Sequence, residues 1–276
     1  MDWYRLFNGR LIGPFIRRRV RVTVEGRENL PRAGACILAM GSHTTEVESL
    51  VVAATLQERK LRFYAKADYW NRKGLRGRVQ RWFMDAVGNI PMKRGQGRAV
   101  LEAIEAGVEV LRRGEVLAVY PEGTRVSDGK VHAAHLGTAD TLLKAHKVMF
   151  AEYEAKLAKY EAKLAEAEMS DAERKSKFAE YKAELAKPRI PIVPVGLMYM
   201  GTVSAPKGGF VPVRGEVLIR IGQPMFLSPM ELRSFKNGGR LAQRMLREEV
   251  SRRMMRRIAR LCEKEYDPGR LTPPRS

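Results

Sequence analysis

Residues 36–48 read Cys-Ile-Leu-Ala-Met-Gly-Ser-His-Thr-Thr-Glu-Val-Glu, an apolar run followed directly by polar side chains. The same order recurs at residues 116–125, where Val-Leu-Ala-Val-Tyr precedes Pro-Glu-Gly-Thr-Arg. A short apolar run of this kind is typical of a buried strand. In open α/β sheets, ligands bind beyond the carboxyl ends of the strands. The two stretches therefore predict a sheet at one edge of which His43, Glu48 and the loop carrying Arg125 come together.

The remainder of a domain spanning residues 20–266 alternates between strand and helix patterns. Further strands are expected at 20–24, 61–65, 87–91, 190–197 and 217–221, and helices at 47–57, 97–113 and 240–266. Pro191 and Pro194 rule out full ladder pairing on both sides of their strand, because proline has no N–H to donate. Strands that alternate with helices favour an α/β fold with a mixed, mostly parallel sheet flanked by helices.

Residues 151–187 differ in composition, because Ala, Glu, Lys and Tyr dominate and neither Gly nor Pro occurs. Apolar side chains recur there at steps of three and four, as in two amphipathic helices. Ser170 and Glu173 have the spacing of a capping box, which begins the second helix. We expect an antiparallel helical hairpin inserted into the domain at about 147–187. Dimerisation, membrane contact and packing on the body of the protein remain open as its role.

The charge of the chain points to an anionic partner. Lys and Arg number 51 against 31 Asp and Glu, giving a net charge of +20. Such an excess suits a lipid surface, nucleic acid or a phosphate-bearing substrate. The stretch 70–83 is both basic and aromatic, but no recognised nucleic-acid motif is present, so nucleic acid is not the expected partner. With two cysteines there is no disulfide framework, and a buried thiol is expected at Cys36.

Residues 1–19 form a separate segment in which aromatic and aliphatic side chains recur at helical spacing among arginines. This pattern suits a segment that lies in a membrane interface, although a staple onto the protein's own core fits as well. Since no stretch approaches the roughly 20 apolar residues of a membrane-spanning helix, we expect a peripheral or monotopic protein on the cytoplasmic face of the cell membrane. The Pro- and Arg-rich residues 267–276 are expected to be disordered.

Four blocks resemble those of the glycerolipid acyltransferases, the 1-acylglycerol-3-phosphate (lysophosphatidate) acyltransferase family. The family carries His-x4-Asp, Gly-x-Ile-Pro-x-x-Arg, Phe-Pro-Glu-Gly-Thr-Arg-Ser and Val-Pro-Val in that order. Here the blocks are His43 to Glu48, then residues 88–94, 120–125 and 192–195, and the resemblance covers residues 20–225 without the insert. Glu48 replaces Asp, Tyr120 replaces Phe and Val126 replaces Ser. Glu at the acid position is similar to a variant in some actinobacterial acyltransferases that act on mannosylated phosphoinositides.

The chemistry requires a base, because an acceptor hydroxyl is a poor nucleophile and imidazole can take its proton near pH 7. His43 is the candidate base, and a carboxylate would fix its tautomer, as in a catalytic triad. Glu48 is expected in that role, with Glu46 as a competitor. The resemblance implies that Arg125 and Arg94 bind the acceptor phosphate. The remaining candidates are Lys66 as a further phosphate contact, Glu122, Gly123 and Thr124 as loop-organising residues, and Pro194 and Val195 as supporting residues.

The expected reaction moves a fatty acyl group from acyl-CoA or acyl carrier protein to the hydroxyl of a lysophospholipid. The first choice of acceptor is 1-acylglycerol 3-phosphate, which would give phosphatidic acid, and a phosphoinositide mannoside or another glycolipid is the alternative. No cofactor or metal is expected, because His132, His135 and His146 lack neighbouring Cys or paired carboxylates. Ser42 lacks the Gly-x-Ser-x-Gly elbow of a hydrolase. A basic nucleic-acid-binding protein and an inactive membrane scaffold are the alternatives of another class.

Overall fold

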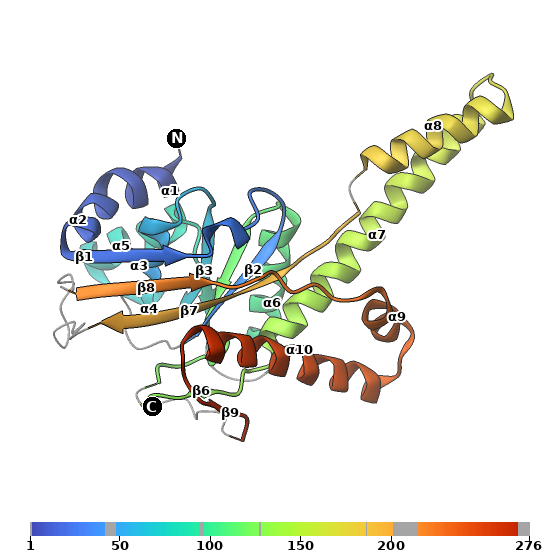
Figure 1. Ribbon diagram of the computed structural model, residues 1–276. Coiled ribbons are helices and arrows are strands. Elements are labelled where there is room, and N and C mark those ends of the chain that lie inside the picture. Colours follow the sequence, from blue (N-terminus) through green and yellow to red (C-terminus); the bar gives the residue numbers. More distant parts are fainter. Residues whose placement is uncertain are drawn as a thin grey trace.

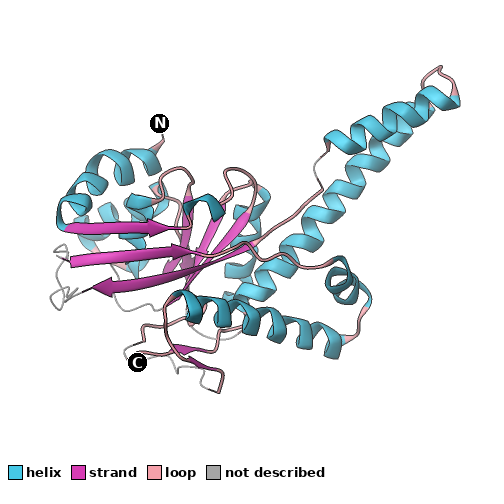
Figure 2. Ribbon diagram, viewed as in Figure 1, coloured by secondary structure: helices cyan, strands magenta, loops and turns pink. Residues whose placement is uncertain are grey.

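The computed structural model describes residues 2–41, 48–93, 97–126, 128–185, 187–200 and 215–269. Ser42, His43, Glu46 and Arg94 lie outside these ranges, so the predictions that fall on them are not placed by the structure. Helices flank both faces of a central sheet (Figures 1 and 2). The helices are α1 Trp3–Arg5, the π-helix η1 Leu6–Leu11, α2 Ile12–Arg19, the 3-10 helix η2 Arg27–Asn29, α3 Glu48–Thr55, α4 Asp68–Asn71, α5 Gly74–Ala86, α6 Arg98–Arg112, α7 Gly137–Ala165, α8 Asp171–Glu184, α9 Pro229–Asn237 and α10 Arg240–Leu261.

The central sheet has seven strands in the order β1-β8-β7-β2-β5-β3-β4. Their bounds are β1 Val20–Glu25, β2 Cys36–Gly41, β3 Leu61–Lys66, β4 Ile90–Met92, β5 Val116–Val119, β7 Ile192–Met200 and β8 Gly215–Ile221. Strands β7, β2, β5, β3 and β4 run parallel, whereas β8 is antiparallel to β7 and β1 is parallel to β8. The predicted mixed, mostly parallel sheet flanked by helices is therefore confirmed. A separate parallel pair joins β6 Val131–His132 to β9 Tyr266–Asp267.

Strand β7 pairs with its two neighbours over different parts of its length. Ile192–Gly196 pair with β2, whereas Val195–Met200 pair with β8, so the two ladders overlap at Val195 and Gly196. Pro194 lies in the ladder with β2, and its carbonyl oxygen accepts a hydrogen bond from the N–H of Gly222 at 2.8 Å. The stagger fits the prediction that prolines prevent full pairing on both sides, because a proline cannot donate to either neighbour.

Two hydrophobic clusters lie on opposite faces of the sheet. One contains side chains of α6, α7 and α10, and the other contains side chains of the N-terminal helices and α3. Strand β2 contributes to both clusters, since Ile37 and Ala39 face the first and Leu38 and Met40 face the second. All six residues of β2 are buried, as expected for a strand covered on both faces.

Helix α7 is longer than the predicted first arm of the hairpin. It begins within the body of the protein at Gly137 and continues for 29 residues. Its first turns lie along α6 in the same direction, because Lys144 pairs with Glu105 and Arg112 pairs with Glu152 at 2.8 and 2.6 Å. Since α6 connects β4 to β5, it runs from the carboxyl ends of the strands towards their amino ends. Helix α7 continues beyond the end of α6 and projects from the body by about 20 Å, at about 1.5 Å per residue (Figure 1).

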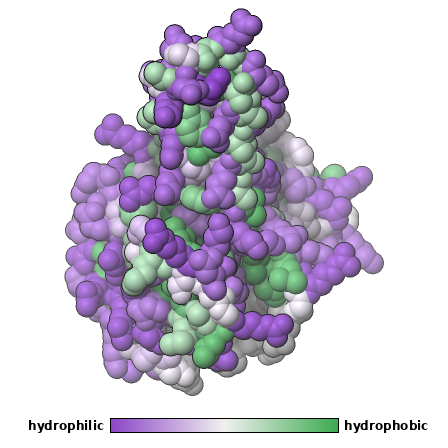
Figure 3. Space-filling view, turned by 90° about the vertical axis from the view of Figure 1, so that its right-hand side faces the viewer, coloured by the Kyte–Doolittle hydropathy of each residue, from purple (hydrophilic) through white to green (hydrophobic). Residues whose placement is uncertain are grey.

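Helix α8 folds back along the projecting part of α7. The rings of Tyr160 and Tyr181 stack at a centroid distance of 4.0 Å, and the Arg174 guanidinium donates to the carbonyl oxygen of Leu164. Ser170 and Glu173 form the capping box that the sequence predicts. Among the described residues of this hairpin, no large hydrophobic side chain is exposed, and the view towards the hairpin shows a largely hydrophilic surface (Figure 3). Its apolar side chains therefore serve mainly the contact between its own two helices.

Two further predictions are wrong at the C-terminal end. The helix expected at 240–266 ends at Leu261, because Glu263 has a positive φ of 54°, which is incompatible with an α-helix. Tyr266 and Asp267 then form β9, so the predicted boundary between the domain and a disordered tail falls inside a strand. Residues 270–276 of that tail lie outside the described ranges.

The N-terminal segment packs against the body with one side and exposes the other. Tyr4 and Ile16 are buried in the cluster that contains α3, and the Arg17 guanidinium donates to the carbonyl oxygen of Ala54. Leu11 and Phe15 are exposed. Because β1 is antiparallel to β2, the end of α2 lies at the edge where β2 ends. Among the described residues, no helix is both long and apolar enough to cross a membrane.

Candidate active site

The carboxyl ends of five parallel strands define one edge of the sheet. Strands β2 and β5 are neighbours in register, with Ala39 beside Val119, so the segments that follow them leave the sheet at the same edge. The first of these segments leads to Glu48 at the start of α3, and the second begins at Tyr120. The Ser49 hydroxyl donates to the Tyr120 hydroxyl oxygen at 3.4 Å. The structure thus brings the beginning of α3 and the beginning of the Arg125 loop together, as the strand pattern predicts.

Glu48 is a buried carboxylate with tyrosines around it. It is 1% exposed, and the hydroxyl of Tyr199, near the end of β7, hydrogen bonds to its side chain. Burial and the negative charge of Glu48 raise the pKa of Tyr120 well above its usual value. The same two causes, in the same order, raise the pKa of Tyr199. Both phenols therefore stay protonated, and the Tyr199 hydroxyl can offset the cost of burying the Glu48 carboxylate.

Two of the departures from the family pattern belong to this one cluster. Glu48 replaces Asp and Tyr120 replaces Phe, and the charge of the first acts on the hydroxyl of the second. Tyr199 is a residue that the sequence analysis did not single out. The available signal was a tyrosine at the end of a buried apolar strand, where its polar hydroxyl needs a partner. The sheet order supplies that partner, because β7 lies directly beside β2, whose end leads to α3.

The loop after β5 is built around a tight turn. The N–H of Gly123 donates to the carbonyl oxygen of Tyr120 at 2.9 Å, and Gly123 has a φ of +68°. A Cβ atom at this position would lie 2.7 Å from Cδ2 of His135, so the turn needs glycine for its conformation and for the close approach. Glu122 is 1% exposed, and its Oε1 accepts a hydrogen bond from the N–H of His132 at 2.8 Å. These contacts fit the loop-organising roles expected for Glu122 and Gly123.

Arg125 extends from this loop between two anchoring residues. Thr124 and Val126 are buried, whereas Arg125 is exposed. The buried neighbours fix the main chain of the loop, so Arg125 presents its guanidinium from a defined position. Burial of Val126 also gives a reason for an apolar side chain where the family has Ser.

The other described candidate residues lie either at the edge of the sheet or inside it. Lys66 is the last residue of β3 and is in register with Met92 of β4, so it stands at the same edge as the Glu48 cluster. Pro194 and Val195 lie inside the sheet, and Val195 is fully buried. They support the strand that carries Tyr199. Among the described residues, no group of His, Cys, Asp and Glu is arranged to hold a metal ion, and the absence of a metal remains a prediction.

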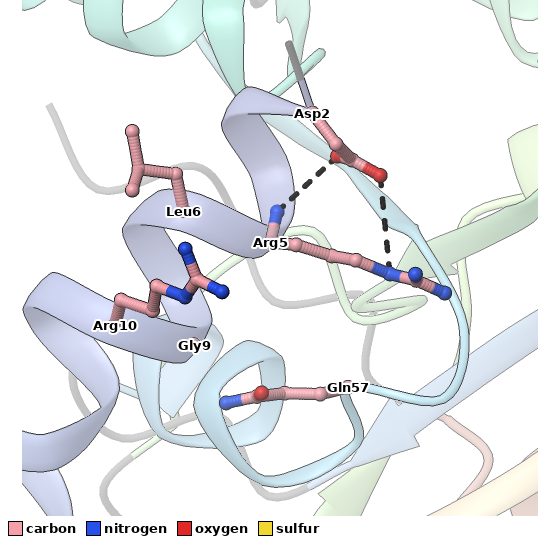
Figure 4. Close-up of a pocket in the computed structure, with 6 residues that line it drawn as sticks. All are labelled: Asp2, Arg5, Leu6, Gly9, Arg10 and Gln57. Atoms are coloured by element: carbon pink, nitrogen blue, oxygen red, sulfur yellow. Dashed lines mark hydrogen bonds and ion pairs between the residues drawn. The ribbon is translucent and has the colours of Figure 1, made fainter.

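A surface pocket of about 510 Å³ lies elsewhere, between the N-terminal helices and the end of α3 (Figure 4). Asp2 in this pocket pairs with Arg5 and with Lys60, so much of the local charge is already satisfied. Gln57 lines the pocket and follows α3, whereas Glu48 is the first residue of that helix. The full length of α3 therefore separates this pocket from the Glu48 cluster.

A family model described as Acyltransferase matches residues 21–198, which is more than half of the chain. The protein belongs to the acyltransferase family. The matched region begins at β1 and ends within β7, so it contains Glu48, the Arg125 loop and the helical hairpin.

Individual relatives are distant. The chain is 23% identical over 111 residues to the chloroplastic 1-acyl-sn-glycerol-3-phosphate acyltransferase LPAT1 of Arabidopsis thaliana and 24% identical over 111 residues to BAT2 of Brassica napus. Each match covers 40% of this chain, but only 29% and 30% of the two plant proteins. Among solved structures, the chain is similar to the 1-acyl-sn-glycerophosphate acyltransferase PlsC of Thermotoga maritima, with 21% identity and a TM-score of 0.48. That match covers 92% of this chain and 77% of PlsC.

Proposed function

We propose that this protein transfers a fatty acyl group from a thioester, acyl-CoA or acyl carrier protein, to the free hydroxyl of a lysophospholipid. The observation that carries the proposal is the buried Glu48 at the carboxyl edge of the sheet, beside the strand that leads into the Arg125 loop. Membership of the acyltransferase family supports the reaction. The names of the two plant relatives support 1-acylglycerol 3-phosphate as acceptor, with phosphatidic acid as product.

In the proposed mechanism, the acceptor hydroxyl attacks the thioester carbonyl carbon while His43 takes the hydroxyl proton. Glu48 accepts a hydrogen bond from the other ring nitrogen of His43 and stabilises the imidazolium. The C–S bond then breaks, an ester remains on the acceptor, and the proton passes from His43 to the leaving thiolate. Arg125 binds the acceptor phosphate, with Arg94 and Lys66 as further cations, because a guanidinium can grip phosphate with two hydrogen bonds.

The direct test is an assay of the purified protein with radiolabelled palmitoyl-CoA. The panel of acceptors contains 1-acylglycerol 3-phosphate, glycerol 3-phosphate and a lysophosphoinositide mannoside, which also tests the alternative acceptor that Glu48 suggests. We expect His43→Ala to abolish transfer and Ser42→Ala to retain it, since Ser42 has no role in the mechanism. Full turnover by His43→Ala, with the thermal unfolding midpoint unchanged, would exclude His43 as the base.

We also propose that the protein docks on an anionic membrane surface, on its cytoplasmic side. The exposed side of the N-terminal segment continues into α5, because Trp3 lies against Trp82 with ring centroids 5.2 Å apart, and Phe7 lies 5.5 Å from Trp82. The large apolar side chains exposed on these two segments are Trp3, Leu11, Phe15, Leu75, Val79 and Trp82. Arginines of both segments, such as Arg10, Arg76 and Arg78, accompany them. This combination is typical of an interfacial membrane contact.

The position of this surface suits a lipid acceptor. Helix α2 ends, and α5 begins, on the side of the sheet where the strands leading to Glu48 and Arg125 end. A lipid in the bilayer would therefore have a short path to the proposed site.

Vesicle sedimentation with phosphatidylglycerol tests the docking. Leu75→Ser should weaken binding about tenfold, the effect of losing an insertion worth about 1–2 kcal/mol. Leu241→Ser on α10 is a matched control, because Leu241 is 72% exposed and Leu75 is 69% exposed, but the two belong to different surfaces. Equal effects of the two substitutions would rule out α5 as the docking surface.

A further inference from the structure

The Arg125 loop is fastened to a segment that follows it in the chain. The Glu122 carboxylate accepts a hydrogen bond from the N–H of His132, and the N–H of His135 donates to the carbonyl oxygen of Pro121 at 2.9 Å. The turn that precedes Arg125 is thereby held at two points. Its position depends on where residues 131–135 lie.

Those residues are in turn held by the C-terminal part of the chain. Strand β6 pairs with β9, with His132 in register with Asp267 (Figure 1). The N–H of Val131 donates to the carbonyl oxygen of Glu265 at 2.9 Å, a main-chain contact that does not depend on the Glu265 side chain. Strand β9, which is remote in sequence from Arg125, therefore fixes the residues that support the Arg125 loop.

The side chain of His132 joins the two parts. It is fully buried, and its Nε2 lies 2.8 and 3.0 Å from the two carboxylate oxygens of Asp128, within the Arg125 loop. Its Nδ1 lies 3.9 Å from Oδ2 of Asp267 on β9. The imidazole thus stands between one carboxylate of the loop and one of the C-terminal strand. The hydrogen bond from the N–H of Lys130, followed by that from His132, lowers the pKa of Asp128, so that carboxylate is charged at neutral pH.

We propose that His132 is a positioning residue that, with Asp128 and Asp267, fixes the Arg125 loop in the geometry that binds the acceptor phosphate. This inference rests on the proposed function, in which Arg125 holds that phosphate. It assigns a role in acceptor binding to β9, which lies outside the region that the family model matches. His132 acts through the loop and does not touch the substrate.

The kinetic test compares two neighbouring carboxylates of the C-terminal segment. Asp267→Asn keeps the shape of the side chain but removes the charge beside His132, whereas Glu265→Gln alters only an exposed ion pair with Lys130. We expect Asp267→Asn and His132→Asn to raise the KM for the lysophospholipid about tenfold, a loss typical of one interaction with a charged group. The KM for acyl-CoA and kcat should stay within about twofold of the wild-type values, and Glu265→Gln should leave all three unchanged.

A merely structural role would lower the unfolding midpoint of Asp267→Asn without changing its acceptor KM, and this result would overturn the proposal. Hydrogen exchange on the full chain gives a readout that does not need catalysis. The amide of His132, which donates to Glu122, should exchange faster in Asp267→Asn than in Glu265→Gln. Equal protection of this amide in the two variants would refute the positioning role of His132, even if the wild-type protein transfers acyl groups. Absence of acyl transfer by the wild-type protein would instead refute the proposed function. Faster exchange in Asp267→Asn would, even then, support the positioning role of His132.

Discussion

Replacing Glu48 with Asp restores the residue that the family pattern has at this position, yet we expect the variant to be less active. The substitution removes one methylene and withdraws the carboxylate by about 1.5 Å. A hydrogen bond with Tyr199 cannot survive an extension of that size. The position is 1% exposed, so water cannot readily replace the lost partner.

The expected loss follows from the strength of the interaction. A hydrogen bond to a charged group contributes about 1.5–3 kcal/mol, and each 1.4 kcal/mol corresponds to a factor of ten in rate. If the geometry of Glu48 supports the imidazolium in the transition state, kcat should fall about 10- to 100-fold in Glu48→Asp. The KM for the acceptor should change little, because Glu48 does not contact the phosphate in the proposed mechanism.

Steady-state assays of Glu48→Asp, Tyr199→Phe and the double variant measure this coupling. Tyr199→Phe should lower kcat by a similar factor, and the double variant should be little worse than either single variant, because all three lack the same hydrogen bond. The reasoning would be refuted if both Glu48→Asp and Tyr199→Phe had the kcat of the wild-type protein. The carboxylate would then not depend on Tyr199.

Three further outcomes are expected. Gly123→Ala should raise the KM for the acceptor, whereas Gly34→Ala should not. Both glycines have a positive φ, but only at Gly123 would a Cβ atom meet another residue. Steady-state kinetics of the two variants check this. Burial lowers the pKa of His146 from 6.5 to about 4. The unfolded chain therefore takes up this proton at a higher pH than the folded protein, and up to about 3 kcal/mol of stability present above pH 6.5 is lost as the pH falls to 4. Urea unfolding of wild type and His146→Met between pH 7 and 4.5 should show a smaller loss in the variant. Replacing residues 157–181 with a short loop should leave kcat unchanged in the acyl-transfer assay, because the apolar side chains of the projecting part of the hairpin pack mainly on each other.

Local patterns predicted most strands within one or two residues, because each is a short apolar run bounded by turn residues. The strand expected at 87–91 is shorter and later, at Ile90–Met92, since Val87 and Gly88 end α5. Helix α7 also begins earlier than the predicted hairpin, at Gly137 instead of about residue 147. Its first turns are buried against both α6 and α10, so they lack the one-sided apolar pattern that marks the projecting part.

Long-range contacts at the candidate site cannot be predicted from the local pattern of any one segment. Tyr199 reaches Glu48 because β7 and β2 are neighbours, and the order of strands cannot be read from any one segment. The surroundings of His132 cannot be predicted for a related reason. One of its two carboxylates, Asp267, comes from a segment that the sequence suggested to be disordered. The motif residues, in contrast, are predicted from the order and spacing of four blocks.

The projecting hairpin provides a labelling site for measuring how the protein is oriented on a membrane. Its tip, at residues 166–170, stands beyond the amino ends of the strands, away from the edge that carries Glu48. A fluorophore attached at Glu168 would therefore lie far from both the candidate site and the N-terminal aromatic rings. Energy transfer from this fluorophore to labelled lipids would report how the molecule tilts on a vesicle, while the edge that carries the candidate site stays unmodified.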